Sequence, residues 1–233
     1  PFLYLFFNKK INYQESLRIL MLITLVGMQG LLGWYMVKSG LSDNPHVSHI
    51  RLMIHLLAAM ILIMFTYIQY LRNSIDNYSK RLNISKEFTV FIVLLVLFQI
   101  SYGAFTAGLK AGYAYNTFPL MDGNILPPDF FLNTSLIHNL FYAPYTIQFI
   151  HRFMGTMLLC VACYIILINL KNNNKNLLES PEIQFSFIVL VQFFLGVLTL
   201  VLKVPVLLGL AHQVCACFVV ILSSKMLFYQ FRK

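Results

Sequence analysis

Six long stretches of the sequence are almost wholly apolar, and the short segments between them hold most of the charges. The stretches span residues 17–37, 50–71, 87–108, 146–169, 184–203 and 206–230. A helix needs about 20 apolar residues to cross the hydrocarbon core of a bilayer. An open strand would leave backbone groups without partners in lipid, so helices are the favoured form. The pattern predicts an all-α, polytopic membrane protein with six transmembrane helices.

The composition agrees with a bilayer as the solvent. Of the 233 residues, 59% are hydrophobic and 11% are charged, and the mean hydropathy is +0.73. A soluble domain of this length carries about 25% charged residues. The low charge content therefore disfavours the soluble classes of protein.

The formal net charge of +9 raises the question of nucleic acid, and the distribution of the charges answers it. Segments 8–18, 72–87 and 171–183, together with the C-terminal end, hold twelve of the 17 Lys and Arg residues, whereas the alternate connections hold four. Basic connections stay on the cytoplasmic side of a membrane. We therefore expect both termini in the cytoplasm, the loop 109–145 outside, and no nucleic-acid partner.

All four cysteines fall within the predicted helices. They are Cys160, Cys163, Cys215 and Cys217. We interpret them as small apolar packing residues. The spacing of the first two also occurs among metal ligands, but the sequence places no third or fourth soft ligand nearby.

A short pattern, glutamine followed four residues later by glycine, occurs in three of the predicted helices. It reads QGLLG at 29–33, QISYG at 99–103 and QFFLG at 192–196, and the next long helix has a histidine near its start each time. The pattern predicts three related helical hairpins.

Repeats in membrane proteins usually form two halves. We therefore expect residues 76–233 to form one complete four-helix bundle, and residues 1–75 to form the second hairpin of another bundle. The first hairpin of that bundle has no counterpart here, and the sequence begins at Pro1 rather than Met. The chain is thus expected to be a fragment that lacks two transmembrane helices.

Three histidines share one depth in the predicted membrane. His55, His151 and His212 each lie about six residues from the outer end of a helix, roughly 8–9 Å below the interface at a rise of about 1.5 Å per residue. A single intramembrane histidine is explained by a hydrogen bond between helices. A shared depth favours ligation instead, and neutral imidazole suits haem iron, zinc or copper. The helices contain almost no carboxylates, which disfavours non-haem iron and a proton relay.

Further candidate residues lie at the same end of the helices. Arg152 follows a histidine directly and suits either a haem propionate or a lipid headgroup. Arg51 and Lys203 are weaker propionate candidates. Small residues on the helix faces leave room for a flat macrocycle or simply pack helices closely. The loop 109–145 is long and apolar enough to be a lid over the histidines or an interfacial anchor.

The sequence resembles the haem A synthase family, in the branch found in alphaproteobacteria and mitochondria. The matching stretches cover most of the chain: GMQGLLGWYMVKSGL, RLMIHLLAA, AGLKAGYAYNTFPLMDG, QFIHRFMG and VQFFLGVLTLVLKVPVLLGLAHQ. The resemblance implies an eight-helix enzyme built from two pseudo-symmetric four-helix bundles, each with a pair of histidines. Six of those eight helices are expected here.

The resemblance also implies roles for individual residues. His151 and His212 match the pair that ligates the iron of a haem b cofactor, with Arg152 beside them. His55 matches a ligand of the substrate haem iron in the other bundle. The glutamate proposed as catalytic in the family has no counterpart in this chain, so the catalytic residue stays unassigned. The paired cysteines of the family's other branch are also missing from the outer loops.

The implied activity is an oxidoreductase reaction, in which the C8 methyl group of haem O becomes a formyl group. The product would be haem A for cytochrome oxidase, and the fragment alone is expected to be inactive. The implied surroundings are a bacterial inner (plasma) membrane, haem O, the bilayer, haem O synthase and a homo-oligomer.

Two other classes of protein remain alternatives. The first is a bis-histidine haem b protein that transfers electrons without oxidation activity of its own. The second is a transporter, whose broken helices would normally place the site at the bilayer midplane. The histidines here lie nearer one face, which argues against a transporter.

Overall fold

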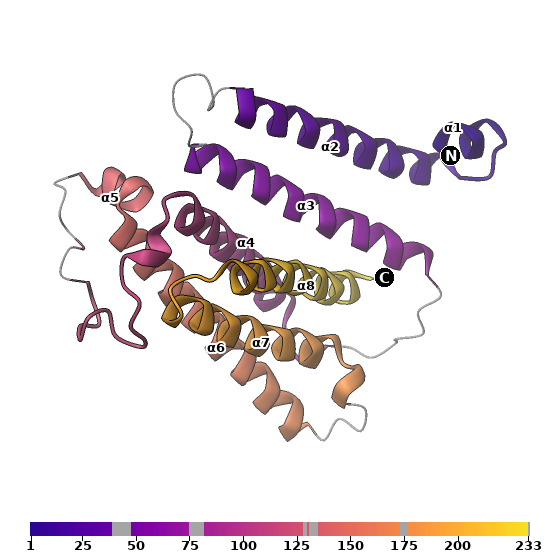
Figure 1. Cartoon of the computed structure of the whole chain (residues 1–233). Helices are drawn as coiled ribbons and strands as arrows, with labels where there is room; N and C mark the ends of the chain where they lie inside the picture. The colour runs from indigo at the N-terminus through magenta and orange to yellow at the C-terminus, as the bar shows by residue number, and fades with distance from the viewer. Residues whose placement is uncertain (39–47, 75–81, 128–129, 131–134, 173–176, 233) are drawn as a thin grey trace.

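The computed structural model describes residues 1–38, 48–74, 82–127, 130, 135–172 and 177–232. This part of the chain is helical apart from its connections (Figure 1). The helices are α1 (Phe2–Phe7), α2 (Tyr13–Lys38), α3 (His49–Asn73), α4 (Lys86–Gly108), α5 (Leu136–Tyr142), α6 (Pro144–Lys171), α7 (Pro181–Val201) and α8 (Val206–Phe231), with the short turns η1 (Ala111–Tyr113) and η2 (Leu177–Glu179).

The all-α membrane fold and the six predicted spans are confirmed. In the described residues, six helices are long and apolar enough to cross a membrane: α2, α3, α4, α6, α7 and α8. The short helices α1 and α5 were not predicted, because six or seven residues are too few for a periodic signal.

Helix α2 begins four residues before its apolar stretch, and a capping box explains the difference. The backbone N–H of Glu15 donates to Oδ1 of Asn12 at 2.8 Å, and the backbone N–H of Asn12 donates to the Glu15 carboxylate at 3.2 Å. These reciprocal bonds satisfy donors that a helix start leaves without partners.

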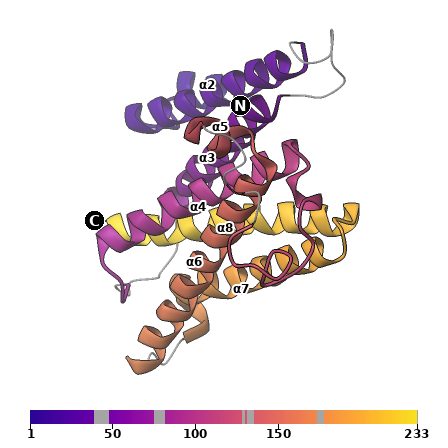
Figure 2. The same ribbon diagram turned by 90° about the vertical axis from the view of Figure 1, so that its left-hand side faces the viewer.

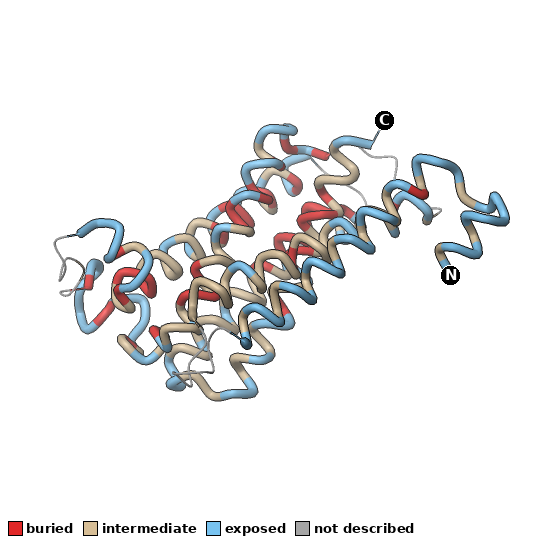
Figure 3. The backbone as a smooth tube through the Cα atoms, turned by 90° about the horizontal axis from the view of Figure 1, so that it is seen from above, coloured by how far each residue is buried: buried red, intermediate tan, exposed pale blue. Residues whose placement is uncertain are grey.

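Helices α4, α6, α7 and α8 form a four-helix bundle, with neighbours in contact around the ring. The main buried apolar cluster lies inside this bundle, and its fully buried members include Ile92, Ile165, Phe185 and Met226. Burial gathers there in Figure 3, whereas the segment that follows the N-terminus is almost wholly exposed or half-buried. The predicted boundary between residues 75 and 76 lies outside the described residues.

The hairpin of α2 and α3 lies on one side of the bundle. Helix α3 packs against α4 and α8, and α2 packs mainly against α3. In both ribbon views α2 forms the edge of the assembly (Figures 1 and 2). Among the residues of α2 only Ser16 is buried. The faces of α2 turned away from α3 are therefore apolar and unpacked.

A buried polar network ties the chain before α4 to helices α6, α7 and α8. Oε1 of Glu182 accepts the backbone N–H groups of Asn83 at 2.8 Å and Ile84 at 3.1 Å. The side chain of Asn83 donates to Oδ1 of Asn169 at 2.8 Å, and the Gln230 amide donates to the Ile84 carbonyl at 3.2 Å. The network fixes one end of the bundle, opposite to the end where the loop before α6 lies.

The cysteines are free thiols, and the packing interpretation holds for only part of them. Cys215 is buried and Cys217 is half-buried, as expected of packing residues. Cys160 and Cys163 are exposed on α6, so the packing prediction is wrong for these two. An outward thiol is tolerated in lipid because it is a weakly polar group.

Candidate functional site

In each of the three predicted hairpins, the glycine of the repeated pattern faces the histidine of the next long helix. A methyl group on the glycine would lie about 3 Å from Cε1 of that histidine. The pairs are Gly33 with His55 at 3.1 Å, Gly103 with His151 at 3.1 Å, and Gly196 with His212 at 2.9 Å. The glycines thus leave the space that the imidazole rings fill. The pattern read from the sequence is a repeated contact between neighbouring helices.

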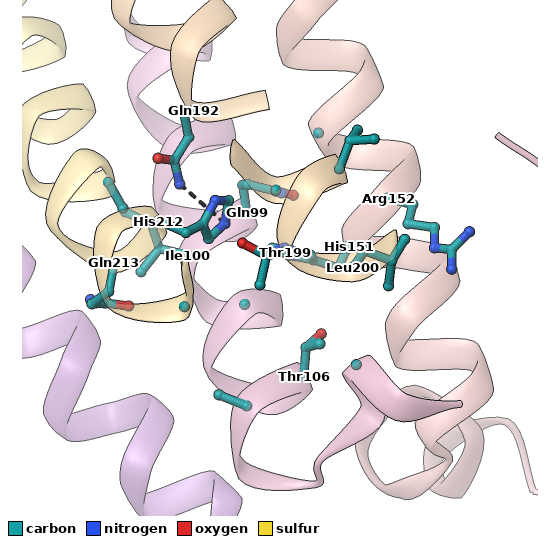
Figure 4. Close-up of a pocket in the computed structure, with 18 of the residues that line it drawn as sticks. Gln99, Ile100, Thr106, His151, Arg152, Gln192, Thr199, Leu200, His212 and Gln213 are labelled. Carbon is teal, nitrogen blue, oxygen red and sulfur yellow. Dashed lines mark hydrogen bonds between the residues drawn. The ribbon is translucent and has the colours of Figure 1, made fainter. Parts of the chain in front are cut away.

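The glutamine of the pattern lies beside the same ring in two of the hairpins. The side-chain nitrogen of Gln192 is 3.2 Å from Nε2 of His212 (Figure 4). The side-chain nitrogen of Gln29 is 3.2 Å from Nδ1 of His55 and donates to the backbone carbonyl of His55 at 3.0 Å. In the third hairpin, Gln99 and His151 line the same cavity. Two of the three imidazoles therefore have the glutamine of the pattern as a measured polar neighbour.

A cavity of about 760 Å³ lies inside the four-helix bundle. His151 and His212 both line it, and Figure 4 shows them entering it from α6 and α8. Most of the other lining residues are apolar or glycine, as in the usual pocket for a cofactor. In the described part of the chain, Nδ1 of His151 and Nδ1 of His212 are buried and have no hydrogen-bond partner.

These features fit a haem. Two histidines with unpartnered ring nitrogens, both lining one roomy and mainly apolar cavity, suit the two axial ligands of a flat macrocycle. Among the described residues no group of three or more His, Cys, Asp or Glu side chains could hold a metal ion. A pair of histidines is fewer ligands than a bare zinc ion takes from a protein. The assignment of iron to these histidines stays a prediction.

His55 lies away from this cavity. It is half-buried between α2 and α3 and faces Gln29 and Gly33, and only its neighbour Leu56 reaches the cavity wall. The structure therefore brings His151 and His212 to one site and leaves His55 at another. The roles of a cofactor pair and a substrate ligand predicted for these histidines stay predictions.

Arg152 holds the loop that precedes α5. Its guanidinium donates to the backbone carbonyl of Thr117 at 2.8 Å and to that of Tyr115 at 2.6 Å. The Gln148 side chain donates to the same Tyr115 carbonyl at 2.9 Å. Both terminal nitrogens of Arg152 are thus occupied by the loop. The propionate and headgroup roles predicted for Arg152 stay untested. Within the described part of the chain, Nε of this side chain is buried without a hydrogen-bond partner.

The loop before α5 covers one end of the cavity. Tyr113 and Phe118 are among the lining residues, and the Asn116 side chain donates to the backbone carbonyl of Leu200 on α7 at 2.9 Å. This geometry favours the lid over the interfacial anchor for residues 109–127. Gln148 and Asn116 were not predicted from the sequence as parts of this site. The signal for Gln148 is a polar residue one turn before a histidine in an apolar helix.

The other propionate candidates lie elsewhere. Arg51 stacks on the ring of Tyr35, with Cζ 4.9 Å from the ring centre, one helical turn before His55. Lys203 lies in the tight turn between α7 and α8 with a φ of 61°. Neither residue lines the cavity that holds His151 and His212.

Comparison with known proteins identifies the family. The family described as cytochrome oxidase assembly protein, COX15-CtaA, matches residues 1–224 of the chain. The chain belongs to this family. A heme A synthase of Wolbachia pipientis wMel is 38% identical over 217 residues, which is 92% of this chain and 60% of that protein.

Two further relatives are also named heme A synthase. The heme A synthase of Brucella anthropi is 40% identical over 204 residues, or 87% of this chain and 57% of that protein. The heme A synthase of Ehrlichia canis is 33% identical over 228 residues, or 97% and 64%. The resemblance to the haem A synthase family is thereby confirmed. The names of these relatives associate the family with haem, and the chain spans about 60% of their length.

Proposed function

We propose that this chain is part of a haem A synthase, which oxidises the C8 methyl group of haem O to a formyl group and yields haem A for cytochrome oxidase. One observation carries the proposal. In a chain of this family, His151 and His212 line one cavity of the four-helix bundle, and each has a buried nitrogen without a partner among the described residues. The activity belongs to the longer protein that the relatives represent, and we expect these 233 residues alone to be inactive.

The cavity would hold haem b between His151 and His212. These histidines would bind the iron, and the glycines behind them would fix the orientation of both rings. The apolar wall would exclude water, and Arg152 would keep the loop closed over the outer end. A bound haem b would supply one-electron transfer at a potential set by its axial ligands and its burial. Electrons removed from the substrate would thereby leave the other bundle.

The substrate would bind at the second site. His55 would ligate the iron of haem O, and Arg51 on the same face of α3 is the nearest basic side chain in sequence that could meet a propionate. Residues 1–75 would form the second hairpin of the substrate bundle, and residues 76–233 the cofactor bundle. The acid or base that assists the oxidation is not assigned to a residue of this chain.

The chain would lie in a bacterial inner membrane with both termini in the cytoplasm. The basic connections support this orientation, because they stay on the cytoplasmic side. The cavity end of the bundle would then face outward. Haem O synthase and a second copy of the chain are the protein partners that fit the proposed activity.

Histidine variants test the ligand assignment. We expect His151→Ala and His212→Ala each to abolish the low-spin haem spectrum of the purified chain, because either change removes one of two axial ligands. His55→Ala is the matched control and should leave that spectrum nearly intact. Retention of the low-spin spectrum in both cavity variants would refute the assignment.

Turnover separates the proposed enzyme from the alternative, a bis-histidine haem b carrier. Both predict the same spectrum, so the spectrum alone does not decide. The longer protein that contains this chain should convert haem O into haem A in membranes, measured by chromatography of extracted haems. A protein that binds haem b and cycles its iron without forming haem A would be the carrier.

A further inference from the structure

Each of the three glutamines in the repeated pattern has a buried side-chain oxygen that accepts no hydrogen bond from the described residues. These oxygens are Oε1 of Gln29, Gln99 and Gln192. A buried acceptor without a partner costs about 1–3 kcal/mol. The same deficit at three equivalent places indicates a donor that arrives when the site is loaded.

A ligating histidine provides that donor. When one ring nitrogen binds iron, the other keeps its proton and needs an acceptor, which orients the ring. At His212 one nitrogen is 3.2 Å from the Gln192 amide, and the other is buried without a partner. A half-turn of a side-chain amide exchanges the positions of its oxygen and its nitrogen. The surrounding hydrogen bonds determine which of the two orientations the amide adopts. A half-turn of the Gln192 amide would direct its oxygen to the ring.

The second cavity histidine, His151, and the glutamine of its hairpin, Gln99, line the same cavity. The side chain of Gln99 lies along α6, because its nitrogen is 3.2 Å from a methyl group placed on Gly155, one turn after His151. The side-chain oxygens of Gln99 and Gln192 are both buried without a partner among the described residues, so Gln99 holds the position in its hairpin that Gln192 holds beside His212.

We propose that Gln192 and Gln99 are positioning residues, whose side-chain oxygens accept the N–H of the iron-binding His212 and His151. This inference rests on the haem site proposed above. A hydrogen bond from the imidazole N–H to the glutamine oxygen makes the imidazole a stronger electron donor to the iron. It thereby stabilises ferric iron and lowers the midpoint potential of the haem. The glutamines would thus set the direction in which the cofactor passes electrons.

The test is a potentiometric titration of the 233-residue chain, purified in detergent and loaded with haem b. Gln192→Leu removes the acceptor and should raise the midpoint potential. Gln192→Glu keeps an oxygen at the same place and should leave the potential at or below that of the unmodified chain. Gln184→Leu is the matched control on α7: its amide donates to Leu178 and accepts from Lys225, away from the cavity. This control should not shift the potential.

The outcomes separate this inference from the proposed function. An unmodified chain that binds no low-spin haem would overturn the haem site and the inference together. A chain that binds haem but keeps its potential in Gln192→Leu would overturn the inference alone. If Gln192→Leu loses haem, Gln192→Glu decides: a retained haem with a potential no higher than that of the unmodified chain supports the inference, and a raised potential refutes it.

Discussion

Gly196 and His212 lie so close that a methyl group on the glycine would be 2.9 Å from Cε1 of the histidine. The ring therefore lies directly against the backbone of α7, and it fits there because Gly196 has no side chain. The same contact at Gly103 with His151 makes the glycines part of the histidine sites.

Gly196→Ala should weaken haem binding without unfolding the bundle. Overpacking of this kind costs about 1–3 kcal/mol, so we expect about 10- to 100-fold weaker binding of haem b, since 1.4 kcal/mol corresponds to about tenfold. A titration of the purified chain with haem b, followed by its low-spin spectrum, measures the change.

Gly27→Ala is the matched control, because a methyl group at Gly27 in α2 meets no atom within 4 Å. This variant should bind haem b as the unmodified chain does. Equal affinities of the Gly196→Ala and Gly27→Ala variants would contradict the role given to the glycine.

Arg152→Met should loosen the loop over the cavity. Hydrogen bonds from a charged group contribute about 1.5–3 kcal/mol, and Arg152 donates two such bonds to the carbonyls of Tyr115 and Thr117. We expect backbone amides of the segment 111–124 to exchange with solvent about 10- to 100-fold faster, measured by hydrogen exchange with mass spectrometry.

Arg72→Met controls for the loss of one positive charge, because Arg72 is exposed at the far end of α3. Its exchange in the segment 111–124 should equal that of the unmodified chain. If Arg152→Met also leaves this exchange unchanged, the loop is held by Gln148 and Asn116 alone.

The spans were predictable from the sequence because they depend on local patterns: apolar runs of the length of a bilayer mark α4 or α8 without knowledge of their neighbours. The repeated glutamine-to-glycine spacing also linked each histidine to the preceding long helix, but depth alone grouped all three histidines. The division into His151 with His212 on one cavity and His55 elsewhere came from the resemblance to the family and depends on how the helices pack. Asn12 and Glu15 form a capping box that marks the start of α2, whereas the apolar pattern alone placed the start later.

The contacts of Arg152 were not predictable in the same way. Its partners are backbone carbonyls of an irregular loop 35 and 37 residues away in sequence. Every residue has a backbone carbonyl, so the residue types do not indicate which carbonyls accept these bonds. The direction of Cys160 and Cys163 was hidden for another reason. Helix α6 is apolar on most of its surface, so the sequence does not indicate which side faces lipid.

Cys160 and Cys163 should react with N-ethylmaleimide in detergent before Cys215 does. The first two are exposed, whereas Cys215 is 6% exposed and must wait for local opening of the bundle. We expect a rate difference of at least about tenfold, followed by mass spectrometry of tryptic peptides. A Cys160→Ser, Cys163→Ser double variant should lose the fast phase, and its persistence would place another thiol on the surface.

Glu182→Ala should destabilise the bundle at the end away from the cavity. The carboxylate is 1% exposed and accepts two backbone N–H groups and the Ser180 hydroxyl, the last at 3.2 Å. Its removal would leave the buried N–H of Ile84 and the part-buried N–H of Asn83 without this acceptor, at about 1–3 kcal/mol for a buried donor and less for the other. We expect a loss of about 2–4 kcal/mol in the free energy of unfolding in detergent.

Glu87→Ala is the matched control, because Glu87 is an exposed carboxylate in the first turn of α4 at the same end of the bundle. Exposed carboxylates near a helix start contribute about 0.3–1 kcal/mol, so its unfolding transition should move much less. Since Glu182 lies outside the cavity wall, Glu182→Ala should retain the low-spin spectrum at temperatures where it is folded. A Glu182→Ala variant as stable as Glu87→Ala would show that water replaces the carboxylate and that the network does not hold the helices together.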